Sequence, residues 1–269
     1  MITALIITAV VLLLAGIVLF AIFPGKNNVP FTGKMRFAHR GYFGDGIPEN
    51  SLPAFRRAVE NGYAVEFDVH LTSDDVLIVF HDDDLKRMCG VDKKTDSCTL
   101  AELREQRLSG GDEVIPTFEE VLSVIDGKVP ILLEIKKSKV GRNSETCRAV
   151  AEVLKTYTGV YVIESFDPYI LKEMKKLMPG VSLGQLSGGI KNASHGFMGA
   201  VLGRLLSNLF FNFISRPNFI AYNIKNEKNV MFRLVGKLGA PCYMWTIRSE
   251  EQHLTAAKYD GEIFEYNKQ

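Results

Sequence analysis

Three carboxylates in apolar runs of this 269-residue chain could together bind a divalent cation. They are Glu66 and Asp68, two residues apart, and Glu134, which lies in a later run. Converging carboxylates without thiolates suit a hard cation, Mg²⁺ or Ca²⁺, better than zinc. A cation there would neutralise a phosphate oxygen and polarise phosphorus. We therefore predict one divalent metal ion at these three residues.

Two histidines and two cationic residues lie in or directly after short apolar runs of the same kind. Hydrolysis of a phosphodiester needs one group that activates a nucleophile and another that protonates the leaving alkoxide, and imidazole suits both steps near neutral pH. We predict that His39 and His81 have these catalytic roles, although spacing does not distinguish the acid from the base. Arg40 and Lys136 would bind the phosphodiester monoanion.

The pattern of the chain predicts a scaffold that brings these residues together. Runs rich in β-branched residues alternate with amphipathic stretches. The predicted strands are Arg36–Arg40, Ala64–His70, Val76–His81, Val129–Lys136, Val160–Ser165, Val181–Leu186, Asn218–Asn223 and Pro241–Thr246. The predicted helices are Ser51–Asn61, Thr117–Ile125, Thr146–Tyr157, Pro168–Leu177, Val230–Leu238 and Glu250–Lys258. Eight parallel strands alternating with helices indicate an α/β fold, a TIM (β/α)8 barrel.

The carboxyl ends of the strands form the active face of such a barrel. Both histidines end predicted strands. Glu66 and Asp68 are two residues apart in one strand, as are Glu134 and Lys136 in another, so each pair faces one side. We therefore expect all of them at the barrel mouth.

Two segments, 83–116 and 187–217, interrupt the alternation, and each follows a predicted strand. The second contains Phe197–Arg216, which is rich in Leu and Phe and has two charges, both arginines. We predict that this insertion contacts the bilayer surface at the barrel mouth. The alternative is a helix buried on the barrel or in a dimer contact.

The first residues of the chain predict a membrane anchor. Ile2–Phe23 contains no charge and, as a helix, is long enough to cross a bilayer. A cleaved signal peptide is the alternative, but no Lys or Arg precedes the segment. We predict an anchor over 1–24, a linker over 25–34 and a barrel over 35–269. Basic residues directly after the anchor favour a barrel on the cytoplasmic face.

Composition limits the remaining possibilities. A net charge of +1 gives no basic surface, so we expect no nucleic-acid partner, and nothing predicts an obligate protein partner. The 46% apolar content is enough for one large core. The four cysteines have scattered spacing and are expected to be free thiols. A bond between Cys89 and Cys98 in an oxidising compartment is the alternative.

At these residues the chain resembles the glycerophosphodiester phosphodiesterase family, one of the barrel phosphodiesterases that include phosphatidylinositol-specific phospholipase C. The resemblance extends over nearly the whole chain after the anchor. Its motifs are H39-R-G, P48-E-N-S-L-P-A-F55, E66-F-D-V-H-L-T72, V79-F-H-D82 with L85-K-R87, I115-P-T-F-E-E-V-L122, L133-E-I-K136, S165-F166 and W245-T246.

The resemblance implies specific roles. The implied metal ligands are Glu66, Asp68 and Glu134; the implied acid and base are His39 and His81; the implied substrate contacts are Arg40, Lys136 and Trp245. Without the resemblance, Trp245 could equally be a core residue. The chain departs from the family pattern at its end, where D260-G-E-I-F-E265 replaces D-G-I-I-T-D, so closure of the last strand is an open question.

Three functional interpretations follow. The resemblance implies metal-dependent hydrolysis of glycerophosphodiesters to glycerol 3-phosphate and an alcohol, as part of phospholipid metabolism at the membrane. An enzyme of lysophospholipase D type, acting on membrane lipids, is the second. A catalytically silent membrane scaffold is the third, and the intact set of ionisable residues argues against it. The motifs do not distinguish a soluble substrate from a lipid substrate.

Overall fold

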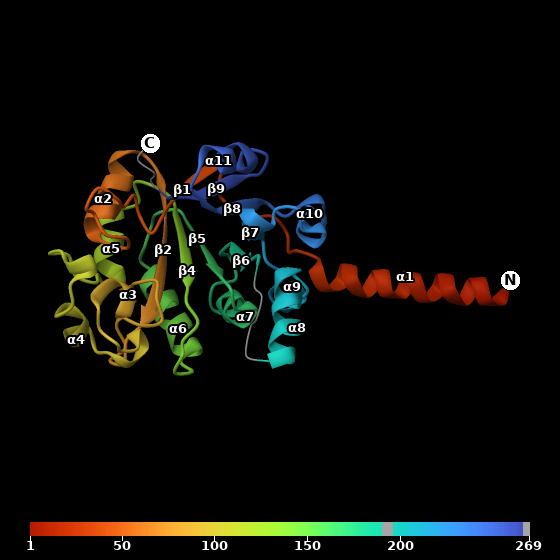
Figure 1. Ribbon diagram of the computed structural model, residues 1–269, viewed down its shortest axis with the longest axis horizontal. Helices are drawn as coiled ribbons and strands as arrows, with labels where there is room; N and C mark the ends of the chain where they lie inside the picture. The colour runs from red at the N-terminus through yellow and green to blue at the C-terminus, as the bar shows by residue number, and fades with distance from the viewer. Residues whose placement is uncertain (190–195, 266–269) are drawn as a thin grey trace.

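Eight parallel strands close into a barrel in the computed structural model of the protein, which describes residues 1–189 and 196–265 (Figure 1). In pairing order they are β1 (Met35–His39), β2 (Ala64–Leu71), β4 (Ile131–Ile135), β5 (Tyr161–Ser165), β6 (Leu183–Ser187), β7 (Phe219–Asn223), β8 (Cys242–Ile247) and β9 (Gly261–Phe264). β9 pairs with β1, which pairs with β2, so the ring is complete. The predicted parallel barrel is confirmed.

One strand assigned to the barrel from the sequence was wrong. The segment predicted as Val76–His81 contains β3 (Leu77–Val79), which pairs antiparallel with the C-terminal end of β2. Five residues separate β2 from β3, and a parallel crossover needs about a dozen or more. The eighth barrel strand is β9, which was not predicted because it is short and contains Gly261 and Glu262. The unusual C-terminal sequence therefore does close the barrel.

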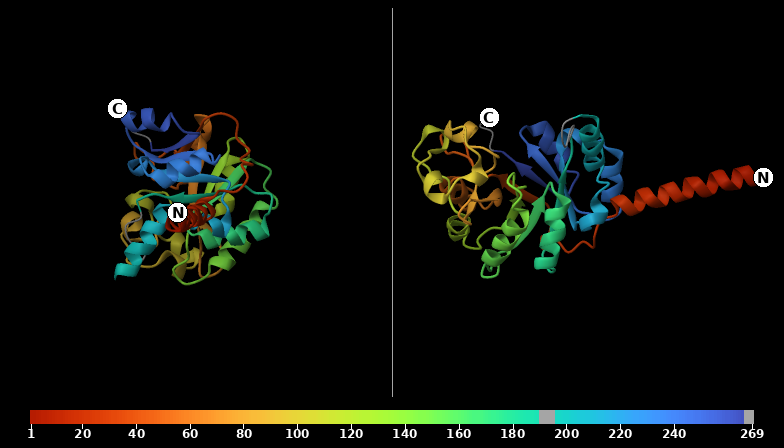
Figure 2. Two further views of the ribbon diagram at one scale, coloured as in Figure 1. Left: turned by 90° about the vertical axis from the view of Figure 1, so that its right-hand side faces the viewer. Right: turned by 90° about the horizontal axis from the view of Figure 1, so that it is seen from below.

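The six predicted helices are confirmed and cover the outside of the barrel (Figures 1 and 2). They are α2 (Leu52–Glu60), α5 (Phe118–Ile125), α6 (Asn143–Leu154), α7 (Pro168–Leu177), α10 (Val230–Lys237) and α11 (Glu250–Ala256). Polar caps fix several starts: the Ser51 hydroxyl accepts from Ala54 N, and Thr117 forms a capping box with Glu120. Their apolar faces pack on the outward-facing strand residues, for example Phe118 on Phe67.

The first insertion, 83–116, has a small core of its own. It contains α3 (Lys86–Cys89), η1 (Thr95–Ser97), α4 (Leu100–Arg104) and η2 (Leu108–Gly110) around a separate apolar cluster. A buried pair joins it to the barrel: the ring of His70 on β2 lies 2.8 Å from an Asp96 carboxylate oxygen. All four cysteines are free, Cys89 and Cys98 included.

The second insertion forms two helices, the second of which packs on the end of the N-terminal helix. They are α8 (Gly196–Ser207) and α9 (Asn212–Ser215); residues 190–195 of the predicted 187–217 insertion lie outside the described residues. The N-terminal helix α1 (Ile2–Ile22) extends away from the barrel, and its end packs on α9 (Figures 1 and 2). Among the described residues, α1 alone has the length and composition to cross a membrane, a property that signal sequences share.

Candidate active site

The site is a polar layer on top of an apolar barrel interior. Leu132 and Val162 fill the interior on β4 and β5, and two residues further along the same strands are Glu134 and Glu164. Because side chains alternate along a strand, these positions face the same side, one layer closer to the carboxyl ends. On β2, Asp68 is the register partner of Glu134, and Glu66, two residues before it, faces the same side. The barrel mouth is therefore acidic.

The three predicted metal ligands come together. One carboxylate oxygen from each of Glu66, Asp68 and Glu134 lies within 4.8 Å of the others, and all three residues are buried. Asp68 Oδ1 accepts no well-aligned hydrogen bond among the described residues, and its near neighbour is the Lys136 ammonium, 3.2 Å away. Buried carboxylate oxygens this close repel one another unless cations compensate them. This donor set, three buried carboxylates that offer only oxygen, fits a hard divalent ion.

Lys136 and Arg40 supply cationic charge at the cluster. Lys136 Nζ lies 3.2 Å from Asp68 Oδ1 and 3.0 Å from Glu134 Oε1, whereas Arg40 Nε lies 3.7 Å from Asp68 Oδ2. Burial opposes ionisation of Asp68, but the nearby cations, Lys136 first, outweigh it and hold the Asp68 pKa well below its usual range. Asp68 is thus the carboxylate that stays ionised most readily.

The other two carboxyl groups of the cluster, Glu134 and Glu66, hold their protons more tightly than Asp68 does. Burial raises the pKa of Glu134 to about 7, although Lys136 opposes the shift. Burial, with the charges of Asp68 and Glu134, raises the pKa of Glu66 well above its ordinary value. The backbone N–H of Arg40 donates to Glu66 Oε2 at 3.0 Å. Without a bound metal ion, the three carboxyl groups therefore do not all carry a full negative charge at neutral pH.

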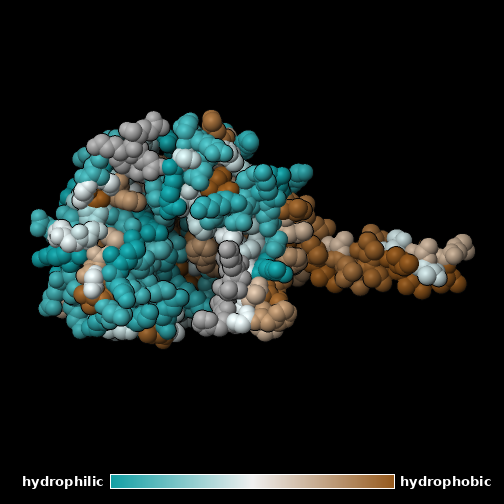
Figure 3. Space-filling model, in the orientation of Figure 1, coloured by the Kyte–Doolittle hydropathy of each residue, from teal (hydrophilic) through white to brown (hydrophobic). Residues whose placement is uncertain are grey.

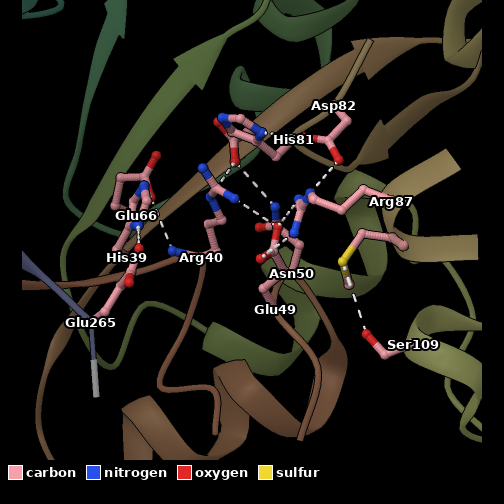
Figure 4. A network of polar contacts seen from close by, with 12 residues as sticks. His39, Arg40, Glu49, Asn50, Glu66, His81, Asp82, Arg87, Ser109 and Glu265 are labelled. Carbon is pink, nitrogen blue, oxygen red and sulfur yellow. Dashed lines mark hydrogen bonds and ion pairs between the residues drawn. The ribbon is translucent and has the colours of Figure 1, made fainter. Parts of the chain in front are cut away.

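His39 ends β1 and is held by a residue from the end of the chain. Its Nδ1 lies 3.0 Å from Glu265 Oε1 (Figure 4). Glu265 also accepts two hydrogen bonds from Arg248. The other ring nitrogen, Nε2, lies 3.8 Å from Glu66 Oε2. Burial lowers the His39 pKa, against the hydrogen bond to Glu265. Glu265 therefore fixes the ring so that a neutral Nε2 faces the carboxylate cluster.

His81 follows β3 and belongs to a chain of ion pairs. Its Nδ1 lies 2.7 Å from Asp82 Oδ1, Arg87 Nε donates to Asp82 at 2.6 Å, and Arg87 also donates to Glu49 at 2.6 Å (Figure 4). Glu49 in turn accepts from Arg40 at 2.7 Å. These ion pairs thus connect His81 to Arg40, the predicted phosphate-binding residue. The first insertion contributes Arg87 to them.

A pocket of about 200 Å³ connects these groups. It is lined by His39, Arg40, Glu66, His81, Glu134, Glu164, Phe166 and Trp245, among others. Trp245 on β8 packs edge-on against Phe166, with ring centroids 5.6 Å apart, and its indole N–H has no hydrogen-bond partner among the described residues. The predicted aromatic residue is therefore a wall of the pocket with an unused donor.

Four residues at the site were not predicted from the sequence. Asp82 contacts His81, and Glu49 accepts a hydrogen bond from Arg40. Glu265 lies in the segment that departs from the family pattern. Glu164 is buried, and one of its oxygens has no hydrogen-bond partner among the described residues. A carboxylate inside an apolar strand was a usable signal for Glu164; the other three depend on tertiary contacts.

Glu265 predicts an acid-dependent loss of stability. Hydrogen bonds from His39 and Arg248 outweigh the effect of burial and lower its pKa from 4.5 to about 2. Its contribution is therefore fully present above about pH 4.5 and is lost as the pH falls towards 2. We expect Glu265→Gln to lower the free energy of unfolding by about 1 kcal/mol at pH 6, after solvent screening, and by less at pH 3.

Thermal unfolding of wild type and variant at both pH values measures this difference. Glu251→Gln, at an exposed position on α11, is the matched control and should unfold like wild type at each pH. An equal gap between Glu265→Gln and wild type at pH 6 and pH 3 would refute the assignment.

Fold and site together define an α/β-barrel enzyme with a carboxylate cluster at the carboxyl ends of its strands. The model of the glycerophosphoryl diester phosphodiesterase family matches residues 39–264, and the chain belongs to this family. That match begins at His39 and ends on β9, so it includes every predicted site residue.

Similar proteins agree with this membership. YhdW of Bacillus subtilis is 28% identical over 244 residues, covering 85% of this chain and 93% of that protein. Lysophospholipase D GDPD1 of Homo sapiens is 32% identical over 133 residues, covering 45% of this chain and 40% of that protein.

Solved structures match over a similar length. A phosphodiesterase of Oleispira antarctica, in complex with the product sn-glycerol-3-phosphate, has a TM-score of 0.70 and 26% identity, covering 86% of this chain and 93% of that one. A glycerophosphodiester phosphodiesterase of Thermotoga maritima has a TM-score of 0.65 and 30% identity, covering 87% and 95%.

Proposed function

We propose that this protein hydrolyses glycerophosphodiesters to glycerol 3-phosphate and an alcohol, using one divalent ion, Mg²⁺ or Ca²⁺. The observation that carries the proposal is the convergence of three buried carboxylates with two histidines on one pocket. The product named for the Oleispira antarctica structure supports the choice of substrate. The intact set of ionisable groups argues against a silent scaffold.

Each residue of the site has a role in this proposal. Glu66, Asp68 and Glu134 would hold the ion, which when bound would neutralise phosphate oxygen and increase the electrophilicity of phosphorus. Arg40 and Lys136 bind the remaining negative charge of the phosphodiester.

The environments of the two histidines suggest how the proton roles divide. His39, neutral and held by Glu265, accepts a proton from the nucleophile at Nε2. His81, held by its partner Asp82, donates a proton to the leaving alkoxide. Trp245 forms the wall against which the glycerol moiety lies.

Product analysis tests the proposal. The purified full chain in lipid nanodiscs is given glycerophosphocholine and glycerophosphoethanolamine, with Mg²⁺, Ca²⁺ or EDTA. We expect glycerol 3-phosphate and free choline or ethanolamine in equal amounts, with a metal only. Release of glycerol together with phosphocholine, or no turnover with any ion, would overturn it.

We also propose that α1 stays in the mature protein as a membrane anchor. The chain then consists of the anchor (1–24), a linker (25–34) and the barrel (35–269). Asn212, buried on α9, donates to the Ile22 carbonyl at 2.9 Å, and Arg216 donates to the Phe20 and Phe23 carbonyls. Phe20 also stacks on Phe213, with ring centroids 6.1 Å apart. Removal of α1 would leave the buried Asn212 amide without this acceptor, which is a cost that supports retention.

A topology experiment checks the proposed cytoplasmic position of the barrel. Basic residues cluster just after α1, so we expect a C-terminal alkaline phosphatase fusion to be inactive and a C-terminal green fluorescent protein fusion to fluoresce. Both fusions should sediment with membranes at full length. An active phosphatase fusion would place the barrel on the opposite face, and a shortened soluble product would indicate a signal sequence.

A further inference from the structure

A second and larger hollow lies beside the catalytic pocket. Its volume is about 630 Å³, within the roughly 300–1,000 Å³ typical of ligand sites. One wall is apolar and comes from the second insertion: Leu202 and Leu206 of α8, with Phe211 just before α9. The opposite wall comes from the loops after β4 and β5. We call this hollow the α8 groove.

The α8 groove is continuous with the catalytic pocket. Glu134 and Phe166 line both, so the groove opens directly onto the carboxylate cluster. Lys136, Lys137 and Lys139 also line the groove, and Lys136 contacts the cluster itself. Each of these lysines pairs with a carboxylate that also lines the groove: Glu134, Asp167 and Asp83 respectively. The combined cavity is therefore charged and polar near the cluster and apolar along α8, which matches an amphipathic molecule.

The position of α8 relates the groove to the membrane. α8 precedes α9, on which the end of α1 packs. At the start of α8, Phe197 and Met198 are 80% and 71% exposed. Figure 3 shows apolar surface along α1 and again at the free end of α8. An anchored barrel thus has its groove next to apolar surface that a bilayer can cover.

We propose that the α8 groove binds the acyl chain of a lysophospholipid, so that the substrate is a membrane lipid with one chain; this rests on the proposed phosphodiesterase function. The phosphate binds at the carboxylate cluster, and the acyl chain extends from the glycerol along Leu202 and Leu206. The oxygen of water forms a bond to phosphorus, and the bond from phosphorus to the headgroup oxygen breaks. The headgroup leaves as an alcohol with one proton, and acylated glycerol 3-phosphate remains.

A single chain fits better than two. The catalytic pocket holds about 200 Å³, below the roughly 300–1,000 Å³ typical of ligand sites, so it accommodates phosphate and glycerol but no second chain. Human lysophospholipase D GDPD1 is one of the relatives of this chain, and its name agrees with such a substrate.

Dependence on chain length tests the groove. Lysophosphatidylcholines with 6, 8 and 10 carbons are assayed as monomers, below their micelle concentrations, with the full chain in nanodiscs and choline release as the readout. Each fully buried methylene contributes a factor of roughly four to kcat/KM, so wild type should gain at least about tenfold from 6 to 10 carbons.

Two groove variants and one control identify the source of that gain. Leu202→Asn combined with Leu206→Asn makes the wall polar, and the ratio between 10 and 6 carbons should fall to within about twofold. Leu206→Trp fills the groove and should move the preferred chain to a shorter length. Phe197→Asn combined with Met198→Asn changes the same helix outside the groove and should keep the wild-type ratio.

The outcomes separate this inference from the proposed function. A flat chain-length profile in wild type that still hydrolyses glycerophosphocholine would overturn the groove and leave the phosphodiesterase standing. Unchanged ratios in both groove variants would overturn it as well, as would equal loss in the Phe197/Met198 control, which would indicate general membrane contact. Absence of metal-dependent turnover of every substrate would instead refute the proposed function.

Discussion

Replacing His39 by alanine should lower kcat/KM for glycerophosphocholine by roughly 10²–10⁴, the usual contribution of a positioned general acid or base. The ring lies within the catalytic pocket, and Glu265 holds it with Nε2 towards the carboxylate cluster. Its lowered pKa means that the imidazole is neutral and available as a base near pH 7. Initial rates at saturating metal, with glycerol 3-phosphate as the readout, measure the effect.

Two further variants make the result specific. His81→Ala should produce a loss of similar size, and its rate should recover for a substrate with a good leaving group, such as a nitrophenyl ester, because such a group needs no proton. His253→Gln changes a half-exposed histidine on α11 that pairs with Glu262 and should keep wild-type rates. Full activity of His39→Ala would contradict the proposed role.

Replacing Asp68 by asparagine should have an effect of comparable size through the metal. Asp68 is the carboxylate of the cluster with the lowest pKa, since Lys136, His81 and Arg40 favour its charge despite burial. Asparagine keeps the size and one oxygen but removes the negative charge that a divalent ion requires. We expect kcat/KM to fall by roughly 10²–10³, as when a preorganised electrostatic contact is lost. Excess Mg²⁺ or Ca²⁺ should restore part of it.

Metal binding should also depend on pH with a definite sign. The ion competes with a proton at Glu134, whose pKa is about 7. Below that value Glu134 is protonated, so each pH unit should weaken metal binding up to about tenfold; above it the dependence on this group should disappear. Calorimetric titration at pH 6, 7 and 8 measures the affinity.

An exposed carboxylate provides the matched control for Asp68. Glu60→Gln, at the end of α2, should change neither rate nor metal affinity. If Asp68→Asn bound metal and turned over substrate like wild type, the cluster would not be the metal site.

Periodicity was sufficient to predict the helices and most of the barrel. The apolar faces of α5 and α7 have a helical period and clear start signals, Thr117 and Asp167–Pro168. It failed where local sequence does not decide the partner of a strand. β3 looks like a buried strand, but its short turn commits it to a hairpin, whereas β9 is recognisable mainly by its place between β8 and β1.

The site shows the same division between local and tertiary information. Glu66, Asp68 and Glu134 could be predicted because burying a charged side chain inside an apolar strand costs free energy unless the charge is paired or binds a metal. Their convergence followed from parallel strands. Glu265 could not be predicted, because its contact with His39 joins residues 226 positions apart. Asp82 could not be predicted either, because its second partner, Arg87, comes from the first insertion.

The role of the carboxylate cluster as a metal site is tested most directly by titrating the metal-free full chain with Mg²⁺ or Ca²⁺ while glycerol 3-phosphate release from glycerophosphocholine is followed. We expect no release in EDTA, and a rate that rises to a plateau as one ion binds per chain. The same titration of Asp68→Asn should give little activity at ion concentrations that saturate wild type. Full activity in EDTA, or a plateau unchanged by the Asp68 variant, would contradict the claim that this carboxylate cluster makes the barrel a metal-dependent phosphodiesterase.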